Sequence, residues 1–328
     1  MGQALKDLSV LIPARNEQWL KPTIDDVLKN CRRNTEIIVV CDGAPPLEPL
    51  PQHPRLNVVM LPHAIGQRAA TNLAARLSSA TYVMKLDAHC AVDKGFDEKL
   101  ITAAEQLGPH VTQIPAQYNL HIFDWVCQAC QHRSYQGPTP IKCEKCGVEQ
   151  RALPQQREIV WKAVRRRTEF WRFDSDLKFQ YWGSYKERPE AQGEIVDVMT
   201  ALGACFFMRR DRFLEIGGLD ERHGSWGQFG VEIALKSVLS GGRHVVNRKT
   251  WFSHLFRTQG ADFGFPYPLS GSETDHARQY SRSLWLRDAW PQQVRPLRWV
   301  LDKYWPVPGW TEAQRDALPT SLKSERAA

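Results

Sequence analysis

Asp87 and His89 are separated by one residue and directly follow the mostly apolar stretch from Tyr82 to Leu86. Such a stretch is typical of a buried strand. Alternate residues of an extended backbone point to the same side, so the carboxylate and the imidazole can reach one point beyond the strand end. One oxygen and one nitrogen ligand suit a divalent cation such as Mn²⁺, which can in turn hold a diphosphate. A helix cap or a turn is the alternative, and the neighbouring elements must decide.

A second group of ligands comes from the cysteines. The chain contains eight cysteines, and four of them form two CxxC motifs: Cys127 with Cys130, and Cys143 with Cys146. The spacing between the pairs, with Gly147 after the last cysteine, predicts a zinc ribbon holding one tetrahedral Zn²⁺. Sulfur-only ligation leaves no open coordination position, so this zinc should be structural. Two redox pairs are the alternative, but they need a strand-to-helix context that is missing here.

Composition limits the class of protein. The 328 residues are 42% hydrophobic and 24% charged, which is ordinary for a soluble globular protein. The longest nearly apolar run, residues 198–208, is too short to span a bilayer, and the N-terminus lacks the pattern of a signal peptide. We therefore expect a cytoplasmic protein in a reducing compartment, without membrane association. A net charge of +7 favours polyanionic partners.

The elements that would position these residues alternate between strand and helix. Thr23 and Asp26 are spaced as a capping box at the start of the first helix, and a second helix is expected after residue 66. Repeated strand-helix units imply a Rossmann-like, mostly parallel sheet whose ligands bind outside the carboxyl ends of the strands. Asn16, Asp42 and Asp87 fall at such ends. Three further apolar runs predict buried strands: residues 8–13, 36–41 and 56–61.

These strand-end motifs resemble those of family 2 glycosyltransferases of the GT-A fold. The match begins with residues 8–17 and 36–43, and the Asp-x-His form at Asp87 is closest to the polypeptide N-acetylgalactosaminyltransferases. In the second half, residues 201–220 resemble the acceptor-side strand and helix of that family. Trp226-Gly227 followed by Glu232 resembles its Trp-Gly-Gly-Glu-Asn segment, although Phe229 stands where the first glutamate is expected. Residues 252–257 resemble its His-Val-Phe-Arg segment.

The resemblance implies a set of site residues. His254 would be the third ligand of Mn²⁺ or Mg²⁺, beside Asp87 and His89. Glu232 could be a general base or orient the acceptor hydroxyl, and Arg257 could pair with the diphosphate. The alternatives are a helix-dipole role for Glu232 and a surface ion pair for Arg257. Donor contacts are expected from seven residues: Pro13, Asn16, Glu17, Asp42, Gly66, Asp87 and Trp226.

Two features concern segments around the site. Asp42-Gly43 could instead be plain turn chemistry. The segment with Gly260, Gly264 and Gly271 resembles the mobile lid of the family, with an ordinary ordered loop as the alternative. A Golgi enzyme is not expected, because the chain lacks the lectin-like repeat and the N-terminal membrane anchor of those transferases.

An insertion separates the two halves. We expect a nucleotide-sugar-binding half over residues 1–120, the zinc ribbon and a basic, aromatic segment over 121–192, an acceptor-side half over 193–270, and a C-terminal helix and tail over 271–328. The inserted basic segment could neutralise phosphates and stack on bases, or it could be a solvated helix packed by its aromatic residues. Its candidate residues are Arg165, Arg166, Arg167, Trp171 and Trp182.

The sequence thus predicts a glycosyltransferase that depends on a divalent metal and uses a nucleotide-diphosphate sugar, with UDP favoured. The ribbon is expected beside the active site, which favours a nucleic-acid acceptor. The most concrete form is a hydroxymethylated pyrimidine in DNA, by analogy with virus-encoded DNA-modifying glycosyltransferases, which would place the protein in the host cytoplasm. Protein or polysaccharide acceptors are the alternatives. A nucleic-acid-binding protein without transferase activity is the alternative of another class.

Overall fold

The computed structural model describes residues 6–165, 169–258 and 261–322, and its centre is one large mixed sheet. Its main strands are β1 (Leu8–Ala14), β2 (Thr35–Cys41), β3 (Leu56–Met60), β4 (Tyr82–Leu86), β6 (Val111–Val126), β11 (Ile195–Asp197), β12 (Cys205–Arg209) and β13 (Arg243–His254). Their spatial order is β11-β13-β6-β12-β4-β1-β2-β3. The strands β3, β2, β1 and β4 are parallel, as are β6 and β13, whereas β12 runs antiparallel between β4 and β6. The predicted α/β architecture is confirmed.

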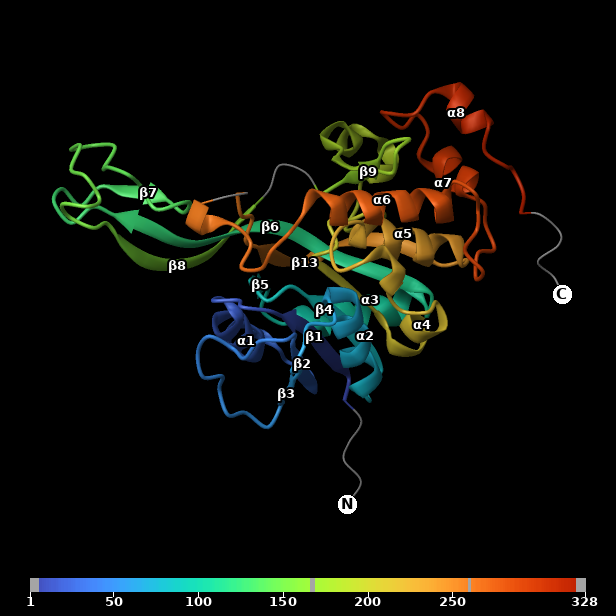
Figure 1. The fold of residues 1–328 in the computed structure, drawn as a ribbon. Helices are drawn as coiled ribbons and strands as arrows, with labels where there is room; N and C mark the ends of the chain where they lie inside the picture. The colour runs from blue at the N-terminus through green and yellow to red at the C-terminus, as the bar shows by residue number, and fades with distance from the viewer. Residues whose placement is uncertain (1–5, 166–168, 259–260, 323–328) are drawn as a thin grey trace, which may run out of the picture.

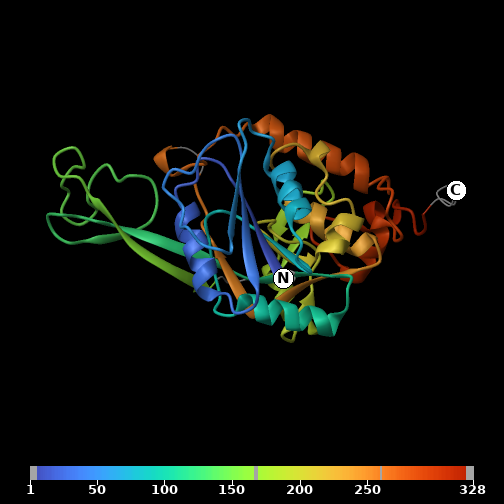
Figure 2. The ribbon, with the colours of Figure 1, turned by 90° about the horizontal axis from the view of Figure 1, so that it is seen from below.

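Burial on both faces explains why the central strands are apolar throughout. Every residue of β1, β2 and β4 is buried, as expected of parallel strands that helices cover on both sides. The connecting helices are α1 (Leu20–Asn30), α2 (Gln67–Leu77) and α3 (Phe96–Leu107). Figure 2 shows α1 and α2 on opposite sides of these strands. The crossovers bring the carboxyl ends of β1, β2 and β4 to the same edge.

The predicted capping box at Thr23 and Asp26 is wrong, because α1 begins before both residues. Their side chains serve a tertiary contact instead. Thr23 Oγ1 accepts a hydrogen bond from the Cys90 amide at 3.0 Å, and Asp26 Oδ1 accepts one from the Val92 amide at 2.8 Å. These amides belong to β5 (Cys90–Val92), a buried strand directly after Asp87 and His89, and buried backbone donors need such partners. The two residues therefore fix α1 to the chain that follows the predicted metal ligands.

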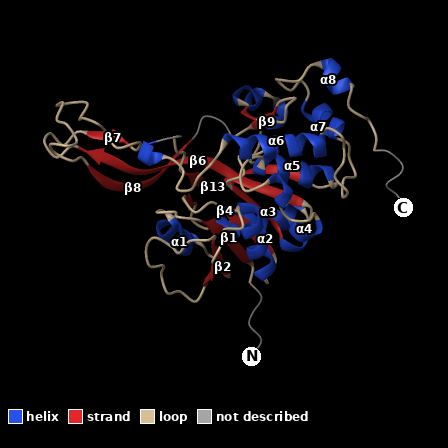
Figure 3. Ribbon diagram, in the orientation of Figure 1, coloured by secondary structure: helices blue, strands red, loops and turns tan. Residues whose placement is uncertain are grey.

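A long hairpin forms an arm on one side of the molecule. β6 continues beyond the sheet and pairs antiparallel with β8 (Gln156–Arg165) and, at its end, with β7 (Arg133–Tyr135). Figure 1 shows the arm projecting from the body, and Figure 3 shows that it consists of strands and loops. The predicted boundary at residue 120 falls inside β6. The insertion is therefore an extension of strands that already belong to the main sheet.

The second half of the chain completes the body. A small two-stranded ribbon follows the arm, with β9 (Trp171–Phe173) paired to β10 (Phe179–Tyr181). The remaining helical elements are η1 (Gly183–Glu187), η2 (Pro189–Ala191), α4 (Arg210–Glu215), η3 (Glu221–His223), α5 (Phe229–Leu239), η4 (Ala261–Phe263), α6 (Gly271–Trp285), α7 (Leu297–Tyr304) and α8 (Glu312–Asp316). The ribbon and α7 share one hydrophobic core with β1, β2 and β4. No helix in the described ranges combines the length and the apolar character needed to cross a membrane.

Candidate active site

A cavity of about 990 Å³ lies at the carboxyl ends of β1, β2 and β4. Both halves of the chain contribute to its walls. Nine of the residues predicted from the sequence line it: Pro13, Glu17, Asp42, Gly66, Asp87, His89, Trp226, His254 and Arg257. The structure therefore brings most of the predicted donor and metal residues to one place.

The side chains of Asp87, His89 and His254 converge in this cavity. One donor atom from each lies within 4.8 Å of the others. His254 Nε2 is 3.0 Å from His89 Nε2 and 3.2 Å from Asp87 Oδ2. Ligands at right angles around an ion with bonds of about 2.1 Å lie about 3.0 Å apart, so these separations suit a six-coordinate divalent cation. The mixed carboxylate and imidazole donors suit Mn²⁺ or Mg²⁺, and the residues present fit such an ion.

The protonation states of these groups favour cation binding. Burial lowers the pKa of His254 to about 4, so its imidazole is neutral near pH 7. Burial opposes ionisation of Asp87, but the charge of Lys85 and the hydrogen bond with His254 outweigh it and hold the pKa of that carboxyl well below its usual range. A carboxylate and a neutral imidazole are the forms that bind a metal ion.

Glu17 orients His89. Its buried carboxylate lies 3.0 Å from His89 Nδ1 and can accept a hydrogen bond from it. The lone pair of His89 Nε2 then points toward His254. Arg257 Nη2 also donates to both oxygens of the Glu17 carboxylate, at 2.6 and 2.7 Å. Burial would raise the pKa of Glu17, but His89 and Arg257 together lower it. Arg257 is thus held by a buried carboxylate inside the cavity, which excludes the surface ion pair considered above.

Lys85 and Gln67 both contact the Oδ1 atom of Asp87. Neither residue was predicted from the sequence. Gln67 Nε2 donates to Asp87 Oδ1 at 2.8 Å, and Lys85 Nζ forms an ion pair with the same oxygen. Lys85 Nζ also donates to the carbonyl oxygen of Gly203 at 2.8 Å. Oδ2 is therefore the oxygen that faces His254. The available signal was a lysine two positions before Asp87, inside an otherwise apolar strand.

The donor end of the cavity is organised by Asp42. Its carboxylate accepts hydrogen bonds from the amides of Ile65 at 2.6 Å and Gly66 at 3.0 Å, at the start of α2. Asp42 thus combines the turn role and the cavity-lining role that were considered as alternatives. Asn16 does not line the cavity, and its amide donates to the Pro266 carbonyl at 3.4 Å. The neighbouring Arg15 lines the cavity instead.

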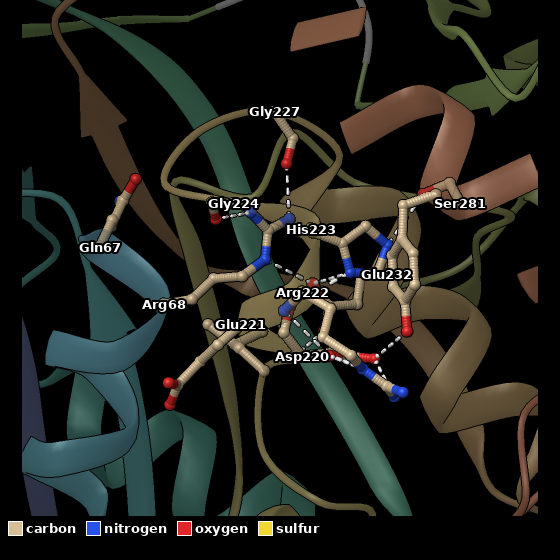
Figure 4. A network of polar contacts seen from close by, with 12 residues as sticks. Gln67, Arg68, Asp220, Glu221, Arg222, His223, Gly224, Gly227, Glu232 and Ser281 are labelled. Atoms are coloured by element: carbon tan, nitrogen blue, oxygen red, sulfur yellow. Dashed lines mark hydrogen bonds and ion pairs between the residues drawn. The ribbon is translucent and has the colours of Figure 1, made fainter. Parts of the chain in front are cut away.

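Glu232 is not placed to be a general base. Its side chain is completely buried, and it does not line the cavity. Its carboxylate pairs with Arg68 at 2.9 Å and Lys236 at 3.2 Å, and it accepts a hydrogen bond from the Asp220 amide (Figure 4). The predicted catalytic role of Glu232 is therefore wrong, because the helix that carries it is buried on every side.

The Glu232 network acts on the cavity through Arg68. Figure 4 shows Arg68 between Glu232 and two backbone carbonyls. Arg68 Nη1 donates to Gly224 at 2.8 Å and Nη2 to Gly227 at 2.6 Å. The turn that carries Trp226 is thereby fixed against α2, and its indole packs edge-on against Phe265 with ring centroids 5.7 Å apart. Glu232 therefore helps to hold the cavity wall.

Of the five residues predicted to bind nucleic acid, the structure describes Arg165, Trp171 and Trp182. Trp171 and Trp182 are only 1% and 3% exposed in the core, so the predicted stacking of bases on these two rings is wrong. Arg165 lies exposed at the end of β8, while Arg166 and Arg167 lie outside the described residues. The inserted segment instead contributes Phe179 and Tyr181 to the cavity.

The four cysteines of the predicted zinc ribbon lie together on the arm, away from the cavity. Cys127 Sγ is 3.6 Å from Cys146 Sγ, and Cys130 Sγ is 3.7 Å from Cys143 Sγ. Zn–S bonds of about 2.3 Å in a tetrahedron place sulfurs about 3.8 Å apart, so the four residues fit a zinc ion. Cys127 is roughly 25 Å along β6 from Asn119, the partner of His254 in the sheet. The expectation of a ribbon beside the active site is wrong, because β6 carries it to the end of the arm.

Comparison with known proteins agrees with this geometry. Residues 9–133 match the family model described as Glycosyl transferase family 2. A crystal structure of GalNAc-T7 with UDP, GalNAc and Mn²⁺ superposes with a TM-score of 0.61 and 16% identity, over 96% of this chain and 54% of that one. The chain has the GT-A glycosyltransferase fold. The family match concerns residues 9–133, and the likeness to GalNAc-T7 is one of fold.

Two curated relatives come from Caenorhabditis elegans. The chain is 24% identical over 131 residues to the probable N-acetylgalactosaminyltransferase 9, which covers 39% of this chain and 22% of that protein. It is 32% identical over 87 residues to the probable N-acetylgalactosaminyltransferase 8, which covers 26% of this chain and 20% of that protein. The aligned part thus spans about a fifth of each curated relative.

Proposed function

We propose that this GT-A protein transfers a sugar from a nucleotide-diphosphate sugar to an acceptor hydroxyl, with the help of a divalent cation. The convergence of Asp87, His89 and His254 in the cavity at the strand ends carries this proposal. The match to a glycosyl transferase family supports the donor class. UDP is the nucleotide we favour, because the GalNAc-T7 structure contains UDP and Mn²⁺.

In the proposed reaction, the acceptor oxygen bonds to the anomeric carbon while the bond from that carbon to the phosphate oxygen breaks. The electron pair stays on the diphosphate, and the acceptor hydroxyl loses its proton. A cation held by Asp87, His89 and His254 would neutralise charge on the leaving diphosphate. Arg257 was predicted to pair with the diphosphate, but Glu17 holds its guanidinium. We therefore assign this role to Arg15, which is exposed and lines the cavity. Phe265 and Tyr267 line the same cavity and limit the access of water.

The stereochemistry we favour is retention, which the resemblance to the polypeptide N-acetylgalactosaminyltransferases suggests. The cavity carboxylates are compatible with it, because each has a protein partner. Glu17 pairs with Arg257, Asp42 accepts two amides, and Glu273 accepts a hydrogen bond from Ser225 at 2.7 Å. No carboxylate among the described residues that line the cavity is thus left to act as an unpaired base.

For the acceptor we propose DNA that contains a 5-hydroxymethylpyrimidine. The net charge of +7 and the projecting arm with its four cysteines support a polyanionic polymer. Two features speak for a protein acceptor instead: the buried Trp171 and Trp182, and the similarity to N-acetylgalactosaminyltransferases. A transfer assay with several nucleotide sugars separates these cases when DNA with and without hydroxymethyl groups is offered beside peptides. Label found on peptide alone would end the DNA proposal.

Substituting Asp87 by alanine tests the enzymatic proposal itself. We expect turnover or hydrolysis of the nucleotide sugar to fall at least 100-fold, because the cation and the charge neutralisation are lost together. Asp25→Ala is the control, since Asp25 is a half-exposed carboxylate on α1 that pairs with Lys21. A protein that only binds nucleic acid would keep its affinity in both variants, and unchanged turnover in Asp87→Ala would contradict the proposal.

A further inference from the structure

The ribbon formed by β9 and β10 carries four aromatic side chains on one face. Phe179 is directly opposite Phe173, and Tyr181 is directly opposite Trp171. Opposite residues of an antiparallel pair share a face, and so do alternate residues of each strand. Trp171 and Phe173 are buried in the core, whereas Tyr181 is 44% exposed and Phe179 is partly exposed. Strand β9 thus carries the two buried rings, and β10 carries the two more exposed rings.

Several contacts fix this ribbon in place. Leu177, in the turn between its strands, is fully buried, and its carbonyl oxygen accepts a hydrogen bond from Gln228 Nε2 at 3.0 Å. Trp310 Nε1 donates to the Phe173 carbonyl oxygen at 3.0 Å. Gln228 itself lines the cavity, directly after Trp226 and Gly227. The position of β10 is therefore tied to the wall of the active site.

Phe179 and Tyr181 line the same cavity as the predicted metal ligands. Their rings lie 5.4 Å apart with an interplanar angle of 79°. They come from the inserted segment, whereas Asp42 and Gly66, at the donor end, follow the strands of the first half. The two rings thus come from a part of the chain that supplies none of the proposed donor contacts.

We infer that Phe179 and Tyr181 form the platform on which the acceptor binds, by stacking against an unpaired nucleobase that carries the reactive hydroxyl. This inference rests on the proposed function. Aromatic rings bind bases through their faces and tolerate different bases. A base must leave its stack to reach a cavity, and partly exposed rings replace that stack.

The test compares Phe179→Ala and Tyr181→Ala with the ring-retaining Tyr181→Phe. Binding of a fluorescent single-stranded oligonucleotide containing 5-hydroxymethyluracil is measured with UDP and Mn²⁺ present, and donor hydrolysis is measured separately. We expect each alanine variant to weaken oligonucleotide binding about tenfold, as loss of a stacked ring does, and Tyr181→Phe to retain it. The KM for the donor should change much less than the oligonucleotide affinity.

Tyr135→Ala is the matched control, since Tyr135 is 55% exposed on the arm and does not line the cavity. Equal oligonucleotide binding by the wild type and both alanine variants would overturn the inference, and so would a wild type that does not bind the oligonucleotide. Transfer to peptide that both alanine variants reduce would overturn the nucleobase as the occupant. Failure of the proposed function looks different, because the wild type would then neither hydrolyse nor transfer any nucleotide sugar.

Discussion

Lys85 is a positioning residue for the cation site. Its side chain is 1% exposed, and its ammonium group pairs with Asp87 Oδ1, so that Oδ2 faces His254. In Lys85→Met, burial would disfavour the Asp87 carboxylate, and the pKa of Asp87 should rise. Groups that hold a metal ligand in place typically change metal affinity about 10- to 100-fold. We therefore expect Mn²⁺ affinity, measured by electron paramagnetic resonance titration, to fall by about this factor.

Lys99→Met provides the control for Lys85→Met. Lys99 also pairs with an aspartate, Asp93, but its side chain is 38% exposed. Its replacement should leave Mn²⁺ affinity unchanged. Equal or tighter Mn²⁺ binding by Lys85→Met would show that Lys85 competes with the cation for Asp87 and does not position it.

Sequence reasoning at the level of single residues worked where the signal was local. Asp87 and His89 lie two positions apart at a strand end, so their shared direction could be predicted from the backbone alone. His254 came only from a family resemblance, because tertiary pairing with β5 and β6 brings it to them. Glu232 was misjudged because its partner Arg68 comes from α2, a contact that no spacing in the sequence reveals.

At the level of elements, the Glu232 network joins α2, α5 and the turn at Trp226. Glu232→Gln would leave the guanidinium of Arg68 buried without its counter-charge, and breaking a buried pair typically costs about 3–5 kcal/mol. We expect a loss of this size in the free energy of unfolding, measured with urea. Glutamine has nearly the same shape as glutamate, so the loss of stability reports mainly the removal of the negative charge.

Glu215→Gln is a control for this prediction, because Glu215 also pairs with an arginine, Arg212, but its side chain is 61% exposed. Its replacement should change the free energy of unfolding by less than about 0.5 kcal/mol. A stable Glu232→Gln protein that has lost only turnover would restore the catalytic role that its burial argues against.

The arm provides the second prediction at this level. Thiolates select zinc, whereas the carboxylate and imidazole site accepts Mn²⁺ or Mg²⁺. Metal analysis after mild chelation should therefore find one retained zinc per chain, and Cys143→Ser should lose it. Cleavage by protease should then increase within residues 127–146, because structural zinc supplies folding energy.

Cys31→Ser is the control, since Cys31 is a free cysteine that lies outside the cysteine cluster. It should keep the zinc and the protease resistance of the parent protein. Freshly purified protein without zinc would contradict the assignment of the four cysteines.

The elements themselves were predictable to different degrees. The parallel strands were recognised because burial on both faces makes them continuously apolar. The position of the cysteine cluster was not, because nothing in the sequence shows that β6 is 16 residues long and extends past the sheet. The aromatic residues after the arm were predicted to stack on bases. Trp171, however, lies on β9 opposite Tyr181 of β10, and its side chain is buried in the core.

On the scale of the whole molecule, buried histidines link stability to pH. Burial lowers the pKa of His223 and of His244 to about 4. The unfolded chain binds protons at these groups near pH 6.5, so it holds more protons than the folded protein between pH 6.5 and 4. Stability should be complete above pH about 6.5 and should fall by about 3 kcal/mol for each histidine as the pH reaches about 4.

His244→Gln tests one of these contributions. His244 Nδ1 lies 3.0 Å from the Val198 carbonyl oxygen, while Nε2 has no hydrogen-bond partner among the described residues. Asp197 and Lys303 are the charges that act on it. Urea unfolding from pH 7 to 4 should show a shallower loss of stability in His244→Gln, whereas the exposed His110→Gln should behave like the parent. Identical slopes in all three proteins would contradict the prediction.

The architecture as a whole was the part that sequence predicted best. Alternating elements and polar residues at strand ends were sufficient for the α/β sheet and for the edge where ligands bind. The cavity wall opposite the strand ends was harder, because it combines β10, the turn at Trp226 and the segment after His254. These pieces are distant in sequence, and only their packing shows that they share one cavity.

The continuity of β6 into the arm makes the length of this hairpin adjustable in steps. Adding two residues to β6 and two opposite them in β8 would move the cysteine cluster outward by about 7 Å. Each side chain would keep its face, because the period of a strand is two residues. A single added residue would turn every later side chain of that strand to the opposite face. The apolar side chains of the arm would then lose their contacts with Trp19 and Phe263. Lengthening in even steps would therefore change the reach of the arm without changing the cavity.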